Sequence, residues 1–288
     1  MSSMKNVLAC ADFSFPLIPH EKALNLIASL DLEGVDIGLF AKGTHLSFHE
    51  EFKNMPFSAR RLAQMIKSFG LKISDVFLTP GEDFVTLAPN HPDYKERQRS
   101  REIFERTLEY TVRCGAGHMT ALPGYVPDHQ EDEAFERCVE EMAWRVEMAR
   151  GAGVIFSVEP HIGSVIPSPA LADKLVSKVP GLTLTLDYSH FIRVGIPQEQ
   201  IDPLIRHASH FHARCACKNK LQASFKDNVI DFRRIVSLMK QHGYSGALGI
   251  EYVWIDWEHC NEVDNLSEIV LLRDFLKKCM KENEIERE

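Results

Sequence analysis

Four short apolar segments of the sequence each run toward an acidic or imidazole side chain. In the stretch Leu-Thr-Leu-Thr-Leu-Asp that ends at Asp187, leucines alternate with polar residues. In a β-strand this alternation places the leucines on one face and the polar side chains on the other. The same alternation puts an acid or imidazole on the polar face of three other segments, at Glu159, His212 and Glu251. We therefore predict that these four side chains point into one common site.

Three carboxylates and one imidazole in one place call for a cation. Without one, the carboxylates would repel one another and raise one another's pKa. A carboxylate-rich ligand set with a single histidine suits Mn²⁺, Mg²⁺ or Co²⁺ better than a structural zinc ion. The sequence therefore predicts one divalent metal ion on Glu159, Asp187, His212 and Glu251, with Mn²⁺ first and Mg²⁺, Co²⁺ or Zn²⁺ as alternatives. His210 shares the face of His212 but lies one layer deeper, where we expect a structural role.

The segments that carry these residues belong to a regular alternation of short apolar runs and longer amphipathic stretches. That order is typical of repeated strand-then-helix units with a parallel sheet. The predicted strands recur roughly every 25 to 45 residues, which is the length that one strand, one helix and two loops consume. They cover residues 7–11, 34–39, 72–78, 118–122, 154–159, 182–187, 210–214 and 247–252.

Helical periodicity and helix-end signals fill the intervals between these strands. Ser168 followed by Pro169 predicts a helix start, and Gly70, Gly115 and Gly243 predict helix ends. About eight units use up the chain, so we predict that residues 1–288 form a single α/β domain, a closed (β/α)8 barrel rather than an open doubly wound sheet. The active site is expected at the carboxyl ends of the strands. Apolar residues recur at helical spacing in 58–69, 94–114, 132–150, 231–242 and 266–280.

Composition limits the classes of partner. The 41 acidic and 33 basic residues give a net charge of -8, which argues against nucleic acid as a partner and favours a small molecule. Seven cysteines without metal-ligand spacing indicate free thiols in a reducing compartment. Neither a signal peptide nor a membrane-spanning stretch is evident, so we expect a cytoplasmic protein without a membrane partner. A homo-oligomer is compatible with the sequence.

The order of the polar residues at the strand ends is more specific than any one of them. It resembles the pattern of the xylose-isomerase-like TIM barrel superfamily, also known as the sugar phosphate isomerase/epimerase family, which includes sugar isomerases, ketose 3-epimerases and endonuclease IV. The likeness spans nearly the whole chain. The segments that carry it are Val158-Glu-Pro-His161, Leu186-Asp-Tyr-Ser-His190, His210-Phe-His-Ala-Arg214 and Ile250-Glu-Tyr252.

The resemblance implies a divalent-metal-dependent isomerase or epimerase that acts on a sugar, keto-sugar or polyol derivative through an enediolate. Glu159 and Glu251 would remove and return the proton, and both match metal ligands of the family along with Asp187 and His212. His190 and Arg214 match positions that hold substrate oxygens. No glycine-rich phosphate loop stands out in the sequence, which favours an unphosphorylated substrate.

Other parts of the pocket are less constrained by the pattern. The segment Pro160-His161-Ile162-Gly163 departs from the epimerases, which leaves the stereochemical course open and makes His161 a further substrate contact or acid–base group. Trp254 and Trp257 follow the last strand and are candidate walls against the apolar face of a sugar. Residues 80–92 predict a long loop over the mouth.

Three rival functions share this residue set. A metal-dependent lyase or dehydratase of a cyclic polyol or keto-sugar would use the same ligands next to a leaving hydroxyl. An endonuclease-IV-like nuclease needs further histidines, which the third predicted strand, ending Phe77-Leu-Thr-Pro80, does not supply. A sugar-binding protein without catalysis has little need for a site full of carboxylates.

Overall fold

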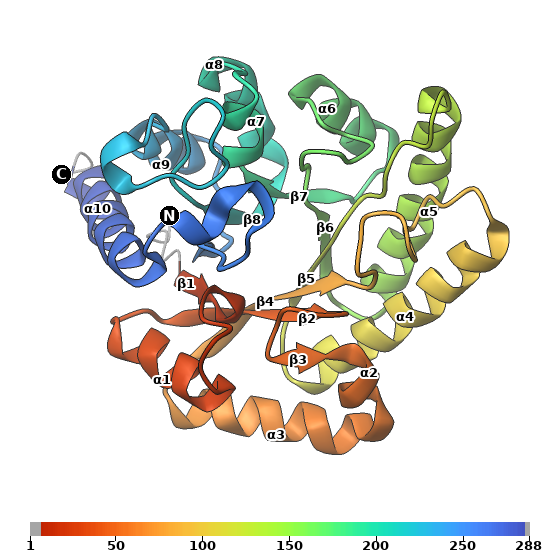
Figure 1. Ribbon diagram of the computed structural model, residues 1–288, viewed down its shortest axis with the longest axis horizontal. Helices are drawn as coiled ribbons and strands as arrows, with labels where there is room; N and C mark the ends of the chain where they lie inside the picture. The colour runs from red at the N-terminus through yellow and green to blue at the C-terminus, as the bar shows by residue number, and fades with distance from the viewer. Residues whose placement is uncertain (1–6, 286–288) are drawn as a thin grey trace.

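Eight parallel strands form a closed barrel in the computed structural model, which describes residues 7–285 (Figure 1). The first strand pairs with the second and also with the last, which closes the sheet on itself. This confirms the predicted (β/α)8 fold. The barrel strands are β1 (Leu8–Ala11), β2 (Gly34–Phe40), β4 (Lys72–Thr79), β5 (His118–Ala121), β6 (Ile155–Val158), β7 (Thr183–Asp187), β8 (Ala208–Ala213) and β9 (Leu248–Ile250).

Helices surround the barrel and connect successive strands (Figure 1). The α-helices are α1 (His20–Ser29), α2 (Phe48–Glu51), α3 (Met55–Ser68), α4 (Tyr94–Arg113), α5 (Glu131–Gly151), α6 (Pro169–Lys178), α7 (Ser189–Arg193), α8 (Gln198–Ile201), α9 (Phe232–Gln241) and α10 (Asn265–Ile285). Short 3-10 helices are η1 (Asp12–Ser14), η2 (Phe52–Asn54), η3 (Asp202–His207), η4 (Phe225–Asp227) and η5 (Trp257–Glu262).

The predicted elements agree closely with the observed ones. Each of the eight predicted strands is present, with ends that differ by at most two residues. The Ser168 side chain caps α6 by accepting a hydrogen bond from Leu171 N, as its position before a proline predicts. Gly70, Gly115 and Gly243 all have positive φ where helices end. The two-residue strand β3 (Leu46–Ser47), which pairs with the end of β2, was not predicted because it is too short to show a pattern.

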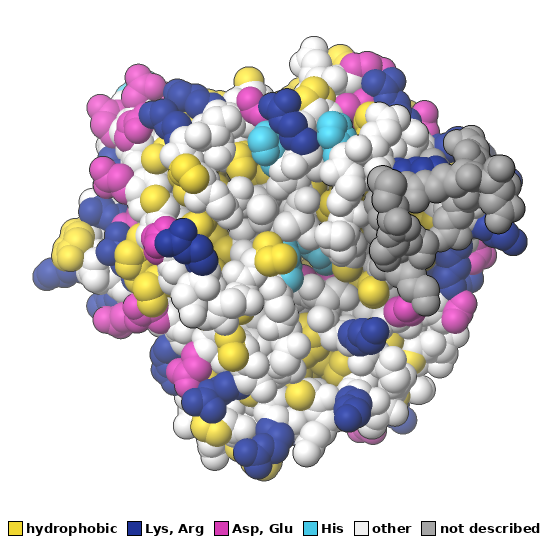
Figure 2. All heavy atoms as spheres, turned by 180° about the vertical axis from the view of Figure 1, so that it is seen from behind, with side chains coloured by type: hydrophobic (Ala, Val, Ile, Leu, Met, Phe, Trp, Pro, Cys, Tyr) yellow, Lys and Arg dark blue, Asp and Glu magenta, His cyan; other side chains and the backbone are white. Residues whose placement is uncertain are grey.

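The outer surface carries charges of both signs. Figure 2 shows the face behind that of Figure 1, where lysine and arginine side chains are interspersed with aspartate and glutamate. Within residues 7–285, no helix combines the length and the apolar character that crossing a bilayer requires. Because both signs of charge are mixed on it, the face shown in Figure 2 presents no extended basic surface.

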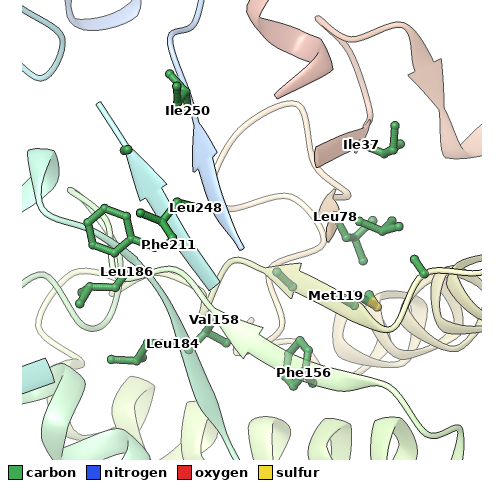
Figure 3. Close-up of a cluster of buried hydrophobic side chains, with 14 of the residues drawn as sticks. Ile37, Leu78, Met119, Phe156, Val158, Leu184, Leu186, Phe211, Leu248 and Ile250 are labelled. Carbon is green, nitrogen blue, oxygen red and sulfur yellow. The ribbon is translucent and has the colours of Figure 1, made fainter. Parts of the chain in front are cut away.

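The strand residues divide between the two faces of the sheet as their alternation predicts. Leu184 and Leu186 of β7 are fully buried in the hydrophobic layer between sheet and helices, together with Phe156 and Phe211 from neighbouring strands (Figure 3). The alternate residue Thr185 turns into the barrel instead, where its hydroxyl lies 2.7 Å from Thr120 Oγ1. Buried hydroxyl groups need such partners, because an unpaired one costs about 1–3 kcal/mol.

Below the mouth, the barrel interior contains polar side chains, among them two histidine–aspartate pairs. His118 Nδ1 lies 2.6 Å from Asp75, and His210 Nε2 lies 3.1 Å from Asp36. The latter pair supports the structural role expected for His210. Space here is tight, since a Cβ on Gly249 would stand 1.8 Å from the Asp36 carboxylate. A glycine on β9 therefore makes room for the buried Asp36–His210 pair.

Candidate metal centre and active site

The four predicted metal ligands converge at the carboxyl ends of four adjacent strands. Asp187 ends β7 and His212 lies near the end of β8, while Glu159 and Glu251 directly follow β6 and β9. All four side chains are buried, with exposed fractions of 5% or less. His212 Nδ1 lies 2.6 Å from Glu159 Oε1 and 3.7 Å from Glu251 Oε2. The expected convergence is thus present in the structure.

The donor atoms are grouped closely enough to hold an ion. Ligand atoms of Glu159, His212 and Glu251 all lie within 4.8 Å of one another, and the same holds for Glu159, Asp187 and His190. Glu251 Oε2 is buried without a hydrogen bond, and its nearest cation is Arg214 Nη2 at 3.3 Å. Hard carboxylate oxygens with one imidazole nitrogen fit a divalent ion such as Mn²⁺ or Mg²⁺.

The pKa values of Glu251 and His212 are shifted by the carboxylates that lie close to them. Burial, with repulsion from Glu159 and Asp187, raises the pKa of Glu251 to about 7, although Arg214 and His212 oppose the shift. Burial by itself would lower the pKa of His212, but the carboxylates of Glu251 and Glu159 outweigh it and raise that pKa to about 10. The carboxylates of the cluster therefore favour a proton on His212 and on Glu251. A divalent ion would take over the role of these protons and displace the one on the imidazole.

Arg214 and His190 complete the polar side of the site. The Arg214 guanidinium forms an ion pair with Asp187, donates to Ser189 Oγ at 3.2 Å, and lies 3.4 Å from His190 Nε2. The other Asp187 oxygen accepts from Ser189 N at 2.8 Å. Burial is the main reason that the pKa of His190 falls to about 4, so its imidazole is neutral at pH 7. Both residues that the family pattern assigned to substrate binding thus lie beside the candidate ligands.

A cavity of about 610 Å³ opens above this cluster. Glu159, Glu251, His190, Arg214 and His161 all line it. Its size falls within the range of about 300–1,000 Å³ that is usual for small-molecule sites. The predicted long loop contributes as well, since residues 81–84 lie in the wall of the cavity.

Trp254 is the one predicted substrate contact that the structure does not bring to this cavity. It lies in a separate hollow of about 260 Å³, with Phe15 and Leu266. The chain after β9 keeps the alternation of the strand, so Val253 and Ile255 line the active cavity and Trp254 turns away. Counting on from Glu251 in steps of two would have revealed this from the sequence.

Several aromatic residues of the cavity were missed. Phe40, Phe77 and Phe84 line it together with Trp257, which the sequence offers as a candidate. Phe77 carried a usable signal, because it shares the inward face of β4 with Asp75. Phe84 lies on the segment between β4 and α4, where strand alternation does not apply.

Comparison with known protein families identifies the fold class. The family model described as xylose isomerase-like TIM barrel matches residues 24–279, and the chain belongs to this family. No curated protein sequence matches the chain.

Solved structures of similar architecture cover almost all of the chain. An L-ribulose 3-epimerase is 16% identical, with a TM-score of 0.75 and coverage of 98% of both chains. A D-psicose 3-epimerase from Clostridium cellulolyticum H10, solved with D-tagatose, is 16% identical, with a TM-score of 0.73 and coverage of 95% of this chain and 99% of that one. A xylose isomerase-like TIM barrel protein from Mycobacterium smegmatis, in complex with magnesium, is 17% identical, with a TM-score of 0.65 and coverage of 97% and 99%. At this identity the likeness establishes a shared fold.

Proposed function

We propose that this protein is a divalent-metal-dependent isomerase or epimerase of a sugar, keto-sugar or polyol derivative. The observation that carries the proposal is a buried cluster at the strand ends, in which Glu159 lies close to His212 and Glu251 and also to Asp187. Glu159 and Glu251 line the cavity above this cluster. The similar structures named as 3-epimerases support the same reaction class. A bound divalent ion would supply Lewis-acid stabilisation of negative charge on substrate oxygens.

The side chains of the site account for the remaining steps. One of Glu159 and Glu251 removes a proton from a carbon next to the substrate carbonyl, which generates an enediolate, and the other returns a proton. Return to the opposite face of that carbon gives an epimer, and return to the neighbouring carbon gives an isomer. Arg214 and neutral His190 orient the substrate oxygens and share the developing charge. Because all these groups are buried, their charges act on the substrate with less screening by solvent than they would at the surface.

Solvent exchange tests this proposal directly. The protein is loaded with Mn²⁺, its metal content is measured, and it is incubated in D₂O with D-psicose, D-tagatose and L-ribulose. We expect deuterium at the carbon that reacts, with the position separating epimerisation from isomerisation. Failure to bind a divalent ion, or the absence of exchange in all three ketoses, would contradict the proposal.

A lyase reaction is the second candidate, because His161 adds a third acid–base group to the cavity. Its Nδ1 donates to Ile162 O at 2.7 Å, which leaves Nε2 with the lone pair, and burial lowers the pKa of the ring. Such a group could take a proton from the substrate carbon and then pass it to the hydroxyl that leaves from the neighbouring carbon, which departs as water. Loss of water from a cyclic polyol or keto-sugar, detected by mass spectrometry, would favour this reaction over isomerisation.

The proposal also covers the metal, the cellular compartment and the partners of the protein. We retain Mn²⁺ as the first metal to test, and the magnesium complex of the Mycobacterium smegmatis protein makes Mg²⁺ the second. Cys10, Cys114, Cys138, Cys215, Cys217 and Cys260 are free thiols, which supports the reducing cytoplasm as the site of action. We treat residues 1–288 as one catalytic domain with a small-molecule substrate and no nucleic-acid partner.

A further inference from the structure

The active cavity has two chemically different parts. Its polar floor is formed by Glu159, Glu251, Arg214, His190 and His161, whereas much of the remaining lining is aromatic or aliphatic. A free sugar carries hydroxyl groups on most of its carbons, and each one buried without a partner costs about 1–3 kcal/mol. If one sugar unit occupies the polar floor, the apolar part of the cavity is therefore poorly matched to a second sugar unit.

One group of aromatic side chains starts directly beside the candidate metal ligands. We call Phe13, Phe40 and Phe77 the aromatic wall; their ring centroids lie 5.0–6.2 Å apart. The Phe77 ring is also 5.7 Å from the ring of His212. Gly38 allows the wall to form, because a Cβ at that position would lie 2.6 Å from Phe13 Cδ1.

A second aromatic pair lines the same cavity from two connecting segments. Phe84 lies 4.6 Å from the His161 ring and 5.9 Å from Trp257, measured between ring centroids. Phe84 and Trp257 are 38% and 36% exposed. Part of their apolar surface is thus uncovered in the structure and available for contact with a ligand.

The charged side chains beyond the polar floor are already engaged. Lys42 Nζ lies 3.1 Å from Glu82. Asp83 accepts from the backbone N–H groups of Val85 and Thr86, at 2.9 and 2.6 Å. Among the residues that line the cavity, the cations are Lys42 and Arg214, and both are paired with carboxylates. A phosphate group on the far part of the substrate would therefore find no unpaired lysine or arginine there.

We infer that the substrate is a sugar-like head joined to an apolar ring, and that this ring packs against the aromatic wall and the Phe84–Trp257 pair. The inference rests on the proposed function, because the polar head is placed at the candidate metal ligands. The volume of about 610 Å³ leaves room for both parts. A glycoside of a phenol or of another cyclic alcohol has the required chemistry, provided that its sugar carries a keto group on a carbon other than the anomeric one, as the proposed reaction needs.

Paired glycosides that differ in one substituent test this inference. Binding of phenyl β-D-glucopyranoside and methyl β-D-glucopyranoside to the full-length protein is measured by saturation-transfer NMR, with Mg²⁺ and again after EDTA treatment. We expect the phenyl glycoside to bind at least about tenfold more tightly, because burial of a phenyl ring approaches that of a Phe side chain. Saturation should be strongest on its ring protons. This preference should persist without metal, so it stands or fails independently of the proposed reaction.

Two tryptophans provide a matched pair of variants. Trp257→Ala, and separately Phe84→Ala, should reduce the preference for the phenyl glycoside to about threefold or less. Trp254→Ala removes a similarly exposed tryptophan outside the cavity and should leave the preference unchanged. Both Trp257 and Phe84 are partly exposed, so their variants should fold, which circular dichroism checks. Equal affinity for the two glycosides, undetectable binding of both, or a preference that survives both cavity variants would overturn the inference.

Discussion

The two sides of the barrel mouth are built from opposite kinds of side chain. Strands β6 to β9 end in the carboxylates and imidazole of the candidate metal centre, whereas β2 and β4, with η1 after β1, supply the aromatic wall. On the first side, buried acids are held by Arg214 and His212 and depend on neutralising charge. On the second side, rings pack on one another and need no partner. On our proposals the first side carries out the reaction and the second selects the substrate, and we call them the chemical side and the selective side.

The largest effect should come from the chemical side. Glu159→Gln keeps the shape of the side chain but removes its charge and its basicity, so we expect turnover to fall by about 10²–10⁴-fold. Solvent deuterium exchange into the substrate measures the loss, and circular dichroism checks the fold. Glu50→Gln removes a largely exposed acid of α2 and should have no effect. Undiminished exchange in Glu159→Gln would remove this glutamate from the acid–base role.

A metal ion bound on the chemical side should stabilise the folded protein. At a concentration of Mn²⁺ about 1,000 times its Kd, the free energy of unfolding should rise by about 4 kcal/mol. His212→Ala deletes one candidate ligand and should abolish most of this gain. Denaturant unfolding with Mn²⁺ and with EDTA measures both values. An equal gain in the wild type and in His212→Ala would mean that the ion binds elsewhere.

A smaller effect is expected from the buried polar layer beneath the candidate metal centre. Gly249→Ala inserts a methyl group 1.8 Å from Asp36 and should destabilise the protein by about 1–3 kcal/mol through overpacking. Gly151→Ala is the control, because nothing lies within 4 Å of a Cβ at that end of α5. It should be neutral or stabilising by up to about 1 kcal/mol. Similar unfolding curves for the two variants would show that the interior tolerates the insertion.

The smallest effect concerns a histidine near the aromatic wall. Burial lowers the pKa of His45 below 6.5, against attraction from Asp12 and with a further contribution from His20. Because the folded-state pKa lies below the unfolded one, protonation favours unfolding, and stability is lost as pH falls through the pKa of the unfolded state. His45→Gln should flatten this dependence between about pH 7 and pH 5. An NMR titration of the His45 ring that gave a pKa above 6.5 would contradict the assignment.

The chemical side could be predicted from sequence, because the signal is local. Each candidate ligand lies on a strand whose period of two can be counted, and parallel strands necessarily bring their carboxyl ends to the same edge. That Glu159, Asp187, His212 and Glu251 lie at the same end of neighbouring strands therefore follows without any knowledge of loops or helices. The strand ends also matched within two residues for the same reason.

The selective side depended on contacts that no local pattern encodes. Phe13, Phe40 and Phe77 come from three separate units, and their packing requires the missing side chain at Gly38. Trp257 reaches the cavity at the start of η5, where Glu258 and the next residue adopt positive φ. The alternation that continues from Glu251 could have shown that Trp254 turns away from the cavity, but the turn that brings Trp257 into it belongs to η5 and not to a strand.

Sequence by itself therefore determined the barrel, the order of its strands and the set of residues at the candidate metal centre, since periodicity and chain order suffice for these. Only the tertiary structure decided which aromatic residues face the cavity, how large it is and which cations are already paired. Those properties arise from packing between segments far apart in the chain, and their energies depend on every neighbour at once.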